Sequence, residues 1–425
     1  EAWSITTQTV AYTNHTIMAE ALEKWDVSLV KSVVPRIYMI IEEIDRRFRA
    51  ELTARFPENQ QRVDEMAVIA GGKVRMAHLA IVGGYSVNGV AWLHTEILKN
   101  KELKNFYEIY PDKFNNKTNG ITHRRWLISA NPALAGFITD KIGDGWISDT
   151  NQLEQLLAFA DDEAVCASLA GIKHNNKVRL ADYIRETCGV NVDANAIFNV
   201  QIKRLHAYKR QLLSILYAIV LYNELKQNPA LDIPPKVFIY GAKAYPSYQL
   251  AKATIKLINA VAEKVNNDLS IQNKLKIVFL ENYNVDLAEK IIPAADVSLQ
   301  ISTASKEASG TGNMKLMMNG AITLATMDGA NVEISNAVGP DNIIIFGLTS
   351  DEVINHSKDY RAQDVISKAP RLSLALAQLQ NGFFGVPGNE FSEIIYDLIF
   401  FRHRQQPACG KAYGGGAGRP AAGFE

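Results

Sequence analysis

From Phe198 onward, short runs rich in β-branched and aromatic residues alternate with longer runs of helical character. The strand-like runs are FNVQIK, KVFIYG, KIVFLENY, DVSLQIS, AITLATM and NIIIFG. Helices are expected between them, over residues 211–227, 248–265 and 286–291. Repeated β–α alternation predicts a parallel sheet with helices on both faces, in which ligands bind beyond the carboxyl ends of the strands.

The chain has a different character before and after this alternation. Residues 11–103 read as mainly helical, and the polar stretch NKTNG at 116–120 reads as a connector. Beyond about Phe400 the chain is rich in Gly, Ala and Pro and lacks large apolar side chains. Such a segment cannot offset the entropy cost of ordering, so residues 401–425 are expected to be a disordered or aberrant tail, as a truncated or frame-shifted gene would produce.

Charge and cysteine content exclude several classes of function. Lys+Arg and Asp+Glu both number 45, so the formal net charge is zero and no global field attracts nucleic acid or an anionic membrane. Cys166, Cys188 and Cys409 stand far apart, without the spacing of a zinc site or a disulfide framework. No apolar run reaches about 20 residues and no signal peptide opens the chain, so a cytoplasmic protein is expected.

Residues 307–334 hold a turn of small residues directly before a helix-forming stretch. In Ser309-Gly310-Thr311-Gly312, two glycines let the backbone approach an anion closely, and the N–H groups that open the helix point at it. Lys315 follows about one helical turn later, where its amine can meet a carbonyl compound whose phosphate the loop holds. This layout suits pyridoxal phosphate. On spacing alone, an ordinary turn followed by a solvated lysine is the alternative.

A second group of candidate residues lies in IKRLHAYKR, between a predicted strand and a predicted helix. Arg204 offers a planar fork of donors, and Lys203 and Lys209 offer point charges. Together they can hold phosphate dianions. Taken alone, such a cluster is also typical of an exposed helix face.

Five blocks of the chain, in this order, resemble the α-glucan phosphorylase family of glycogen, starch and maltodextrin phosphorylases. They are AYTNHTIMAEALEKW, NKTNGITHRRW, NVQIKRLHAYKRQ, LENYNVDLAEKIIPAADVSLQIS and EASGTGNMKLMMNGAITLATMDGANVEI, and the resemblance runs from Glu1 to about Phe384. It implies an α/β protein of the GT-B type, with two Rossmann-like domains facing a cleft. Residues 1–118 would be the C-terminal, mainly helical part of an incomplete N-terminal catalytic domain, and residues 119–400 a doubly wound, Rossmann-like, cofactor-binding C-terminal domain.

The resemblance implies a cofactor and the residues that hold it. Lys315 resembles the lysine that binds pyridoxal 5'-phosphate as a covalent imine. Thr311 and Gly312 resemble donors to the cofactor phosphate, and Tyr283 and Trp126 resemble further contacts of the cofactor pocket.

The resemblance also implies a substrate site. Lys203 and Lys209 resemble ligands of the cofactor or substrate phosphate, and Arg204 resembles the arginine that clamps inorganic phosphate. With His15 they make up the implied catalytic set. The positions that match residues bonded to a terminal glucose are His15, Asn119, Glu307, Ser309 and Gly310. Without the resemblance, His15 reads as a helix-start residue and Asn119 as a turn residue.

The implied reaction is reversible phosphorolysis of an α-1,4-glucan end to α-glucose 1-phosphate, with retained configuration. The ligands are then glucan, inorganic phosphate and glucose 1-phosphate, with no nucleic acid or membrane partner, and the full-length enzyme is expected to be a homodimer. Most retaining glycosidases use paired carboxylates. This family is expected to use the cofactor phosphate as acid and base instead, because a second phosphate pKa near 6 suits exchange near neutrality.

The resemblance has limits that affect function. Ala19, His123, Ala207 and Leu299 depart from the family's usual residues, and Ala207 and Leu299 are expected to loosen hydrogen bonds around the basic cluster. The front half of the family's sequence is not matched, so the isolated chain is expected to have little or no activity. Two alternatives stay open: a pyridoxal-phosphate enzyme of amino-acid metabolism, and a non-catalytic GT-B remnant that binds sugar or a partner.

Overall fold

The computed structural model describes residues 1–18, 21–357 and 359–400. Ala19 and the tail 401–425, for which the sequence makes predictions, lie outside these ranges. The described chain divides into two compact units, one of residues 1–17 and 83–400 and the other of residues 18–82. The assignment of residues 1–118 and 119–400 to two catalytic domains stays a prediction.

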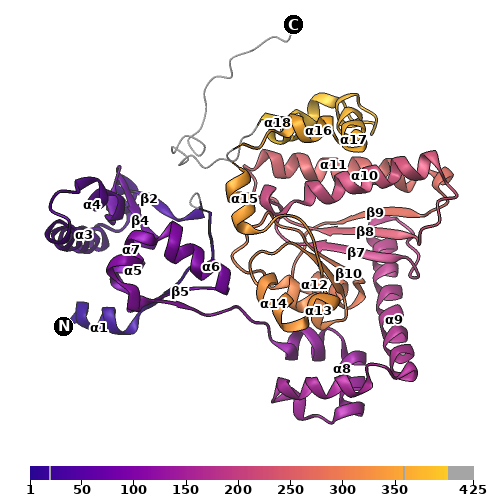
Figure 1. Cartoon of the computed structure of the whole chain (residues 1–425), viewed down its shortest axis with the longest axis horizontal. Helices are drawn as coiled ribbons and strands as arrows, with labels where there is room; N and C mark the ends of the chain where they lie inside the picture. Colours follow the sequence, from indigo (N-terminus) through magenta and orange to yellow (C-terminus); the bar gives the residue numbers. More distant parts are fainter. Residues whose placement is uncertain (19–20, 358, 401–425) are drawn as a thin grey trace, which may run out of the picture. The chain divides into compact units, whose positions relative to one another are not determined.

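A six-stranded parallel sheet forms the centre of the larger unit (Figure 1). Its order is β12-β11-β10-β7-β8-β9, and every neighbouring pair runs parallel. The strands are β7 (Ile197–Ile202), β8 (Lys236–Gly241), β9 (Leu275–Leu280), β10 (Val297–Gln300), β11 (Ile322–Ala325) and β12 (Ile344–Ile345). The register aligns Val200, Ile239 and Val278 across three strands, so their buried side chains form one apolar row. The parallel sheet predicted from the β–α alternation is confirmed.

Helices pack on both faces of this sheet, because its central strands are apolar on both sides. On one face, α10 and α11 share a core with β8 and β9, and on the other, α9 and α12 share a core with β7, β8 and β9 (Figure 1). These helices are α9 (Glu163–Cys188), α10 (Gln211–Gln227), α11 (Gln249–Asn266) and α12 (Val285–Ala294). Fully buried Ile219 and Leu257 lie in the first core, and Ile184 and Ile291 in the second. The sheet edge that carries the loops is therefore held from both sides.

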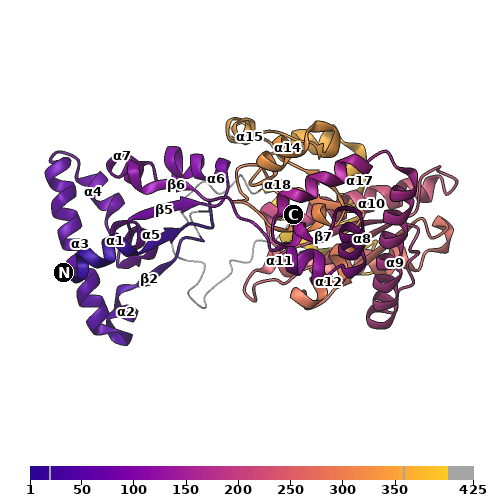
Figure 2. The ribbon, with the colours of Figure 1, turned by 90° about the horizontal axis from the view of Figure 1, so that it is seen from below.

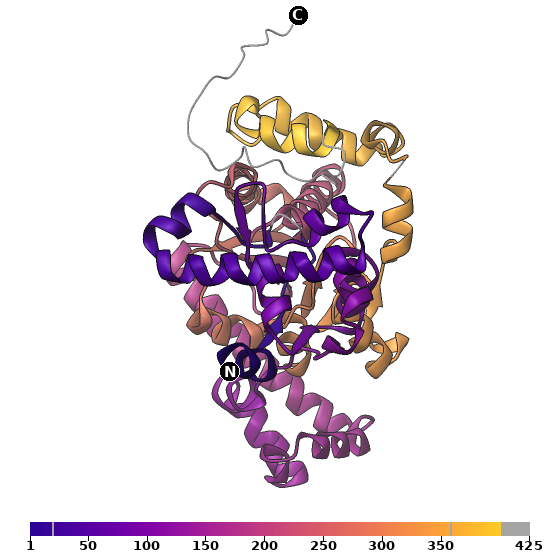
Figure 3. The ribbon, with the colours of Figure 1, turned by 90° about the vertical axis from the view of Figure 1, so that its left-hand side faces the viewer.

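The last described helices form an outer layer over α10 and α11, drawn in yellow in Figure 3. Buried Leu379 of α17 and Ile394 of α18 belong to the same core as α10 and α11. The helices not yet given bounds in this part of the unit are α8 (Pro132–Ile142), α13 (Gly312–Met318), α14 (Asn331–Val338), α15 (Ser350–His356), α16 (Ala362–Ser367), α17 (Pro370–Gln380) and α18 (Ser392–Phe400). Among the described helices, none combines the length and the apolar composition needed to cross a membrane.

A three-stranded parallel sheet, β1-β5-β6, also belongs to the larger unit, and Figure 2 shows β5 beside β6 with α6 and α7 next to them. The elements are α1 (Ala2–Thr9), β1 (Ala11–Thr13), β5 (Ser86–Gly89), α6 (Trp92–Ile97), α7 (Lys104–Ile109) and β6 (Phe114–Asn116). The mainly helical reading of residues 11–103 misses β1 and β5, and also three short strands of the smaller unit at residues 24–26, 69–70 and 73–75. The strands β1 and β5 are only three and four residues long, and β1 pairs with residues 86–88, far along the chain.

The smaller unit packs helices against a short antiparallel sheet of order β2-β4-β3. Its elements are β2 (Lys24–Asp26), α2 (Val27–Val33), α3 (Pro35–Arg55), α4 (Gln60–Met66), β3 (Ile69–Ala70), β4 (Lys73–Arg75) and the start of α5 (Met76–Gly83). Tyr38, Ile41, Asp45, Phe48 and Leu52 are the buried residues of α3, at the spacing of one helix face. The carboxylate of Asp45 accepts the N–H groups of Val68 and Ile69 at 2.8 and 3.0 Å, which joins α3 to β3.

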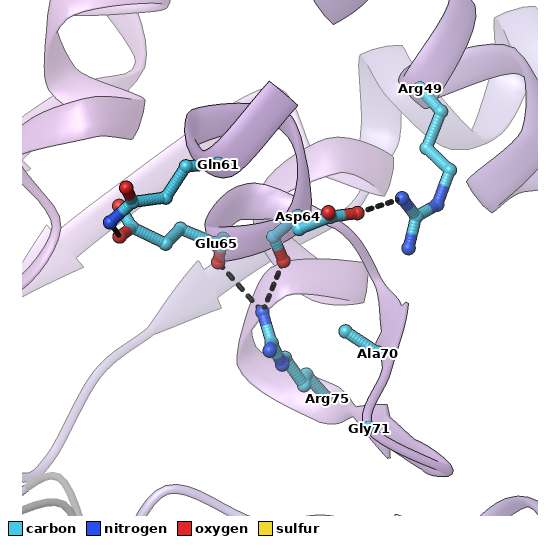
Figure 4. A pocket seen from close by; sticks show the side chains of 7 residues that line it. All are labelled: Arg49, Gln61, Asp64, Glu65, Ala70, Gly71 and Arg75. Atoms are coloured by element: carbon cyan, nitrogen blue, oxygen red, sulfur yellow. Dashed lines mark hydrogen bonds and ion pairs between the residues drawn. The ribbon is translucent and has the colours of Figure 1, made fainter. Parts of the chain in front are cut away.

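A pocket in the smaller unit is lined by Arg49, Gln61, Asp64, Glu65, Ala70, Gly71 and Arg75 (Figure 4). Its cations already bond within the pocket. Arg49 Nη1 lies 2.7 Å from Asp64 Oδ1, and Arg75 Nη1 donates to the carbonyl oxygens of Asp64 and Glu65 at 3.1 and 2.7 Å. None of the predicted site residues lines it.

The core between the sheet and α10 generates a stability prediction. Ile219→Ala removes a fully buried side chain, so we expect the free energy of unfolding to fall by about 2–4 kcal/mol in urea denaturation. The matched control is Ile5→Ala, also in a helix, where the side chain is 56% exposed and the change is expected within about 0.5 kcal/mol. Equal losses for the two variants would contradict the assigned core.

Candidate functional site

Loops at the carboxyl ends of the parallel strands carry most of the predicted site residues. Lys203 directly follows β7, Tyr283 follows β9, and Glu307 follows β10. Since all strands of the sheet are parallel, these ends lie at one edge, where open α/β sheets bind their ligands. Side-chain contacts among the loops then define the site.

Lys209 and Glu307 form an ion pair at the centre of this edge, with 2.6 Å between Lys209 Nζ and Glu307 Oε2. Their side chains are only 14% and 17% exposed. Burial lowers the pKa of Lys209, but Glu307 and Tyr208 outweigh it and raise the pKa above its ordinary value. Burial likewise raises the pKa of Glu307, but Lys209 and Lys203 bring it below its ordinary value. Both groups are therefore held in their charged forms.

Glu307 has further partners that fix its direction. Ser302 Oγ donates to Glu307 Oε2 at 3.2 Å, and the Tyr208 hydroxyl donates to Oε1 at 3.5 Å. The Lys209 ammonium also lies 4.6 Å from the centre of the Tyr208 ring. The structure thus brings two of the predicted residues together and adds two neighbours that the motifs did not single out.

Lys203 lies close to the same group. Its Nζ donates to Gln300 Oε1 at 3.0 Å, and the amide of Gln300 in turn donates to Ser298 Oγ at 3.0 Å. Burial lowers the pKa of Lys203 to about 8; the Lys209 cation adds to this, and the Glu307 carboxylate opposes it. A second ammonium is therefore kept near the ion pair at a cost in desolvation.

The two arginines of this loop differ in their surroundings. The side chain of Arg204 is exposed, while its carbonyl oxygen accepts from Gln211 Nε2 at 2.9 Å. Arg210 turns inward, with φ of 57°, and its Nε donates to the carbonyl oxygen of Ile301 at 2.6 Å. Arg210 therefore ties this loop to the chain that follows β10, whereas Arg204 presents its guanidinium at the surface.

Lys315 lies on α13 with its Nζ 4.1 Å from the centre of the Trp126 ring. Burial lowers the pKa of Lys315 below its ordinary value. Trp126 belongs to the same core as Leu316 of α13, and its carbonyl oxygen accepts from Asn319 Nδ2 at 2.8 Å. The lysine and the indole are thus held as a fixed pair.

Tyr283 packs against the ends of β7 and β8. A Cβ at Gly241 would lie 3.0 Å from Ile202 Cγ2 and 3.2 Å from Tyr283 Cδ2, so the missing side chain lets the ring lie against the strand end. Burial raises the pKa of the Tyr283 hydroxyl to about 12. Tyr283 and Trp126 both border the core that holds Ile202. They supply aromatic surface on the Lys315 side of the sheet.

The small-residue turn lies beside the amide that binds Lys203. Gly310 has φ of 81°, a region that glycine adopts without steric cost. A Cβ at Gly312 would lie 3.8 Å from Gln300 Nε2, an ordinary contact distance. The carbonyl oxygen of Thr311 accepts the N–H of Lys315 at 3.1 Å, and Ser309 Oγ donates to the carbonyl oxygen of Gly310 at 3.1 Å.

His15 is exposed on the loop after β1, and its neighbour Asn14 is buried. Asn14 Oδ1 accepts the N–H of Thr16 at 2.9 Å and lies 3.0 Å from His94 Nε2. Burial lowers the pKa of His94 to about 4, so its ring is neutral; its Nδ1 accepts the N–H of Val90, which leaves Nε2 as the donor to Asn14. His94 thus fixes the loop that carries His15, a role no motif indicated.

Asn119 is tied to the end of β5, because its N–H donates to the carbonyl oxygen of Val90 at 2.9 Å. Val90 shares a small core with Ala308, the residue after Glu307. The adjacent Thr118 hydroxyl donates to Glu333 Oε1 at 2.5 Å. Asn119 is therefore bonded to Val90, and it is Val90 that shares a core with the loop of Glu307.

The carbohydrate phosphorylase family model matches residues 1–408. Glycogen phosphorylase of Bacillus subtilis (strain 168) is 53% identical over 401 residues, which cover 94% of this chain and 50% of that protein. The muscle form of glycogen phosphorylase from Oryctolagus cuniculus is 46% identical over 408 residues, which cover 95% of this chain and 48% of that protein, and the liver form from Homo sapiens matches over the same shares. The chain spans about half the length of the curated relatives it matches.

The low pKa of Lys203 generates a prediction on stability. Below pH 8 Lys203 is protonated in both the folded and the unfolded chain, so the folded state is destabilised by the full desolvation free energy of the buried ammonium. Between pH 8 and 10.5 only the unfolded chain keeps this proton, so the destabilisation decreases as the pH rises. We expect Lys203→Met to raise the free energy of unfolding by about 1–3 kcal/mol at pH 7 and by less at pH 10, in urea denaturation.

The control for this comparison is Lys252→Met, at an exposed lysine of α11, which is expected to change stability by less than about 0.5 kcal/mol at either pH. A Lys203→Met variant that is less stable than the wild type at pH 7 would contradict the assigned burial.

Proposed function

The chain belongs to the carbohydrate phosphorylase family, and we propose that it carries the cofactor-binding half of an α-1,4-glucan phosphorylase. The family expected from the sequence motifs is confirmed. The proposed reaction is retaining phosphorolysis of α-1,4-glucan ends to α-glucose 1-phosphate. The proposed architecture is of the GT-B type, to which residues 1–118 and 119–400 contribute parts of two Rossmann-like domains.

The observation that carries this proposal is a partly buried cluster of cationic side chains at the carboxyl ends of parallel strands. Lys203 and Lys209 lie within one loop, share the neighbourhood of Glu307, and are both largely shielded from water. Arg204 presents an exposed guanidinium on the same loop. Phosphate dianions suit such a cluster, because they offer several charged oxygens to both kinds of cation.

Pyridoxal 5'-phosphate fits the residues around Lys315. Burial lowers the pKa of this amine and so increases the uncharged share that can attach to an aldehyde. The rings of Trp126 and Tyr283 supply flat apolar surface for a pyridine ring. Gly310 and Gly312 lack side chains that would keep a phosphate from the backbone. When bound, the cofactor would supply a phosphate whose second pKa near 6 suits proton exchange near neutral pH.

Different residues of the chain are proposed to bind the phosphate groups and the sugar. In this proposal, Lys203 and Lys209 neutralise the phosphate groups and Arg204 orients inorganic phosphate through its planar fork. Two phosphates can lie close together only where such cations offset their repulsion. Residues proposed to bond the terminal glucose are His15, Asn119, Glu307, Ser309 and Gly310. Each buried sugar hydroxyl left without a partner would cost about 1–3 kcal/mol, which is why a ring of donors and acceptors is needed.

The proposed ligands are α-1,4-glucan, inorganic phosphate and glucose 1-phosphate. The relatives are named as glycogen phosphorylases, so glycogen is the glucan we propose first. A homodimer, which the family resemblance implies, and a cytoplasmic location, which the sequence predicts, are proposed for the full-length protein.

Attachment of the cofactor gives the first test. Pyridoxal phosphate mixed with the purified chain and reduced with borohydride is expected to label Lys315, because this amine combines a lowered pKa with the adjacent Trp126 ring and the glycine-containing turn that precedes its helix. Peptide mass spectrometry locates the label, and Lys315→Ala is expected to lose it. Lys306→Ala, at a lysine on the neighbouring loop, serves as the control and is expected to keep it. Label distributed over other lysines would count against the proposed site.

Turnover gives the second test. We expect the isolated chain with pyridoxal phosphate to release glucose 1-phosphate from maltodextrin at least about 100-fold more slowly than the Bacillus subtilis relative, because catalysis depends on the positioning of both substrates and the chain spans half of that protein. Release is measured with and without inorganic phosphate. Turnover equal to that of the relative would contradict this expectation. A rate of glucose 1-phosphate release that does not depend on inorganic phosphate would contradict the proposed reaction.

A further inference from the structure

The loop before the small-residue turn wraps around one buried carboxylate. Asp328 is 1% exposed, and its Oδ1 accepts the N–H of Ser305 at 2.9 Å. Its Oδ2 accepts the N–H groups of Lys306 and Glu307 at 3.2 and 2.8 Å. Ser305 has φ of 73°, which is unusual for a residue with a side chain and turns its N–H toward the same point as the next two. Three successive N–H groups thus form a concave nest around a side chain of the same protein.

The residues after Asp328 hold the other end of this loop. The N–H of Ala330 donates to the carbonyl oxygen of Ser309 at 2.9 Å. Gly329 has φ of 53°, and a Cβ there would lie 2.6 Å from the carbonyl oxygen of Ser309 and 3.1 Å from that of Glu307. The loop therefore lies directly on the backbone of residues 328–330, and only glycine at the middle position permits this approach.

Glu307 is the residue whose placement depends most on these contacts. Its own N–H is one of the three that donate to Asp328, so the backbone of Glu307 is fixed next to the Asp328 carboxylate. At the other end of that side chain, Oε2 meets Lys209 Nζ at 2.6 Å and Ser302 Oγ at 3.2 Å. The hydrogen bond to Asp328 and the ion pair with Lys209 thus hold Glu307 at both ends.

We propose that Asp328 is a positioning residue, which shapes the loop of residues 305–309 so that Glu307 meets Lys209. The importance of this pair rests on the proposed function, in which Lys209 binds phosphate and Glu307 binds sugar. The contact network itself stands without that function. Asp328 touches neither ligand in this scheme and acts through Glu307.

A carboxylate is the group that the nest requires. In the ionised form its two oxygens present only acceptors, which match three N–H donors. The amide of asparagine has the same shape but one acceptor oxygen, so its NH₂ group would face at least one N–H donor. Burial and the Glu307 carboxylate raise the pKa of Asp328 to about 7, although the three N–H donors act to lower it. Burying this ionised carboxylate therefore costs folding free energy.

The test uses the reactivity of Lys209 in the intact chain. The rate at which limiting acetic anhydride labels each lysine is measured by peptide mass spectrometry at pH 8. Asp328→Asn is expected to release Glu307, lower the pKa of Lys209 and raise its labelling rate about threefold to tenfold, since one pKa unit corresponds to about a tenfold change in free amine. Glu307→Gln should give the same rise, and the double variant no more than either alone.

Two controls separate positioning from loss of stability. Lys177, a buried lysine 2.7 Å from Asp296, is the internal reference and should keep its labelling rate in all variants. Asp45→Asn changes another buried carboxylate that accepts two successive N–H groups, in the smaller unit, and should leave Lys209 unchanged. A lower unfolding midpoint for Asp328→Asn with an unchanged Lys209 rate, or additive effects in the double variant, would overturn the inference.

Hydrogen exchange keeps the inference testable if Asp328→Asn does not fold. In the wild type and in Glu307→Gln, the amides of residues 305–307 are expected to be protected at least about 100-fold relative to an unstructured peptide, because their acceptor is Asp328 in both. Exchange at unprotected rates would refute it. Failure of the proposed function alone would look different: Lys209 would respond to Asp328→Asn while Lys315 took up no pyridoxal phosphate.

Discussion

The ion pair between Lys209 and Glu307 is the interaction on which the rest of the site depends. Its two groups come from loops after β7 and β10, neighbouring strands of one parallel sheet, and meet at 2.6 Å with little exposure to water. Removing one partner of such a pair leaves a buried charge without compensation, which usually costs several kcal/mol. The pair therefore joins the two loops to each other. Gln300 lies between Lys203, which donates to its side-chain oxygen, and Gly312 of the small-residue turn, which faces its nitrogen.

The fold contributes the edge at which these loops meet. Because both faces of the six-stranded sheet are covered by helices, its strand ends are held in fixed positions and only the connecting loops face outward. Glycine is needed at the points of closest approach. Gly241 admits the ring of Tyr283 at the end of β8, and Gly329 admits the backbone of the Glu307 loop. Local backbone strain at Ser305 and Arg210 is compensated by hydrogen bonds that these conformations allow.

Local patterns in the sequence predicted the elements well where periodicity was strong, and the site only in part. The helix expected over 211–227 is found as α10 with the same bounds, and α12 extends beyond the expected 286–291 through Pro293, which lies in its last turn. The strands β1 and β5 were missed because pairing between distant segments, rather than local pattern, makes them strands. Long-range contacts also define the site, and local patterns do not show them. Lys315 was recognised one turn after the glycines, but its contact with Trp126 joins residues far apart in the chain. No motif marked His94, and Glu333 lies in the block of residues 307–334 without having been singled out.

The way the two site lysines are held suggests why their cost in desolvation is compatible with binding an anion. An ammonium group has three N–H donors. In the described part of the chain, Lys203 directs one of them to the neutral oxygen of Gln300, and Lys209 is the lysine that pairs directly with the carboxylate of Glu307. A fully paired cluster would have no donors for a phosphate, and a fully unpaired one would be too costly to bury. Pairing one cation with a carboxylate and the other with an amide leaves Lys203 without a directly paired carboxylate, so in the proposed function a phosphate dianion would complete the hydrogen bonding of Lys203 without displacing a counter-ion.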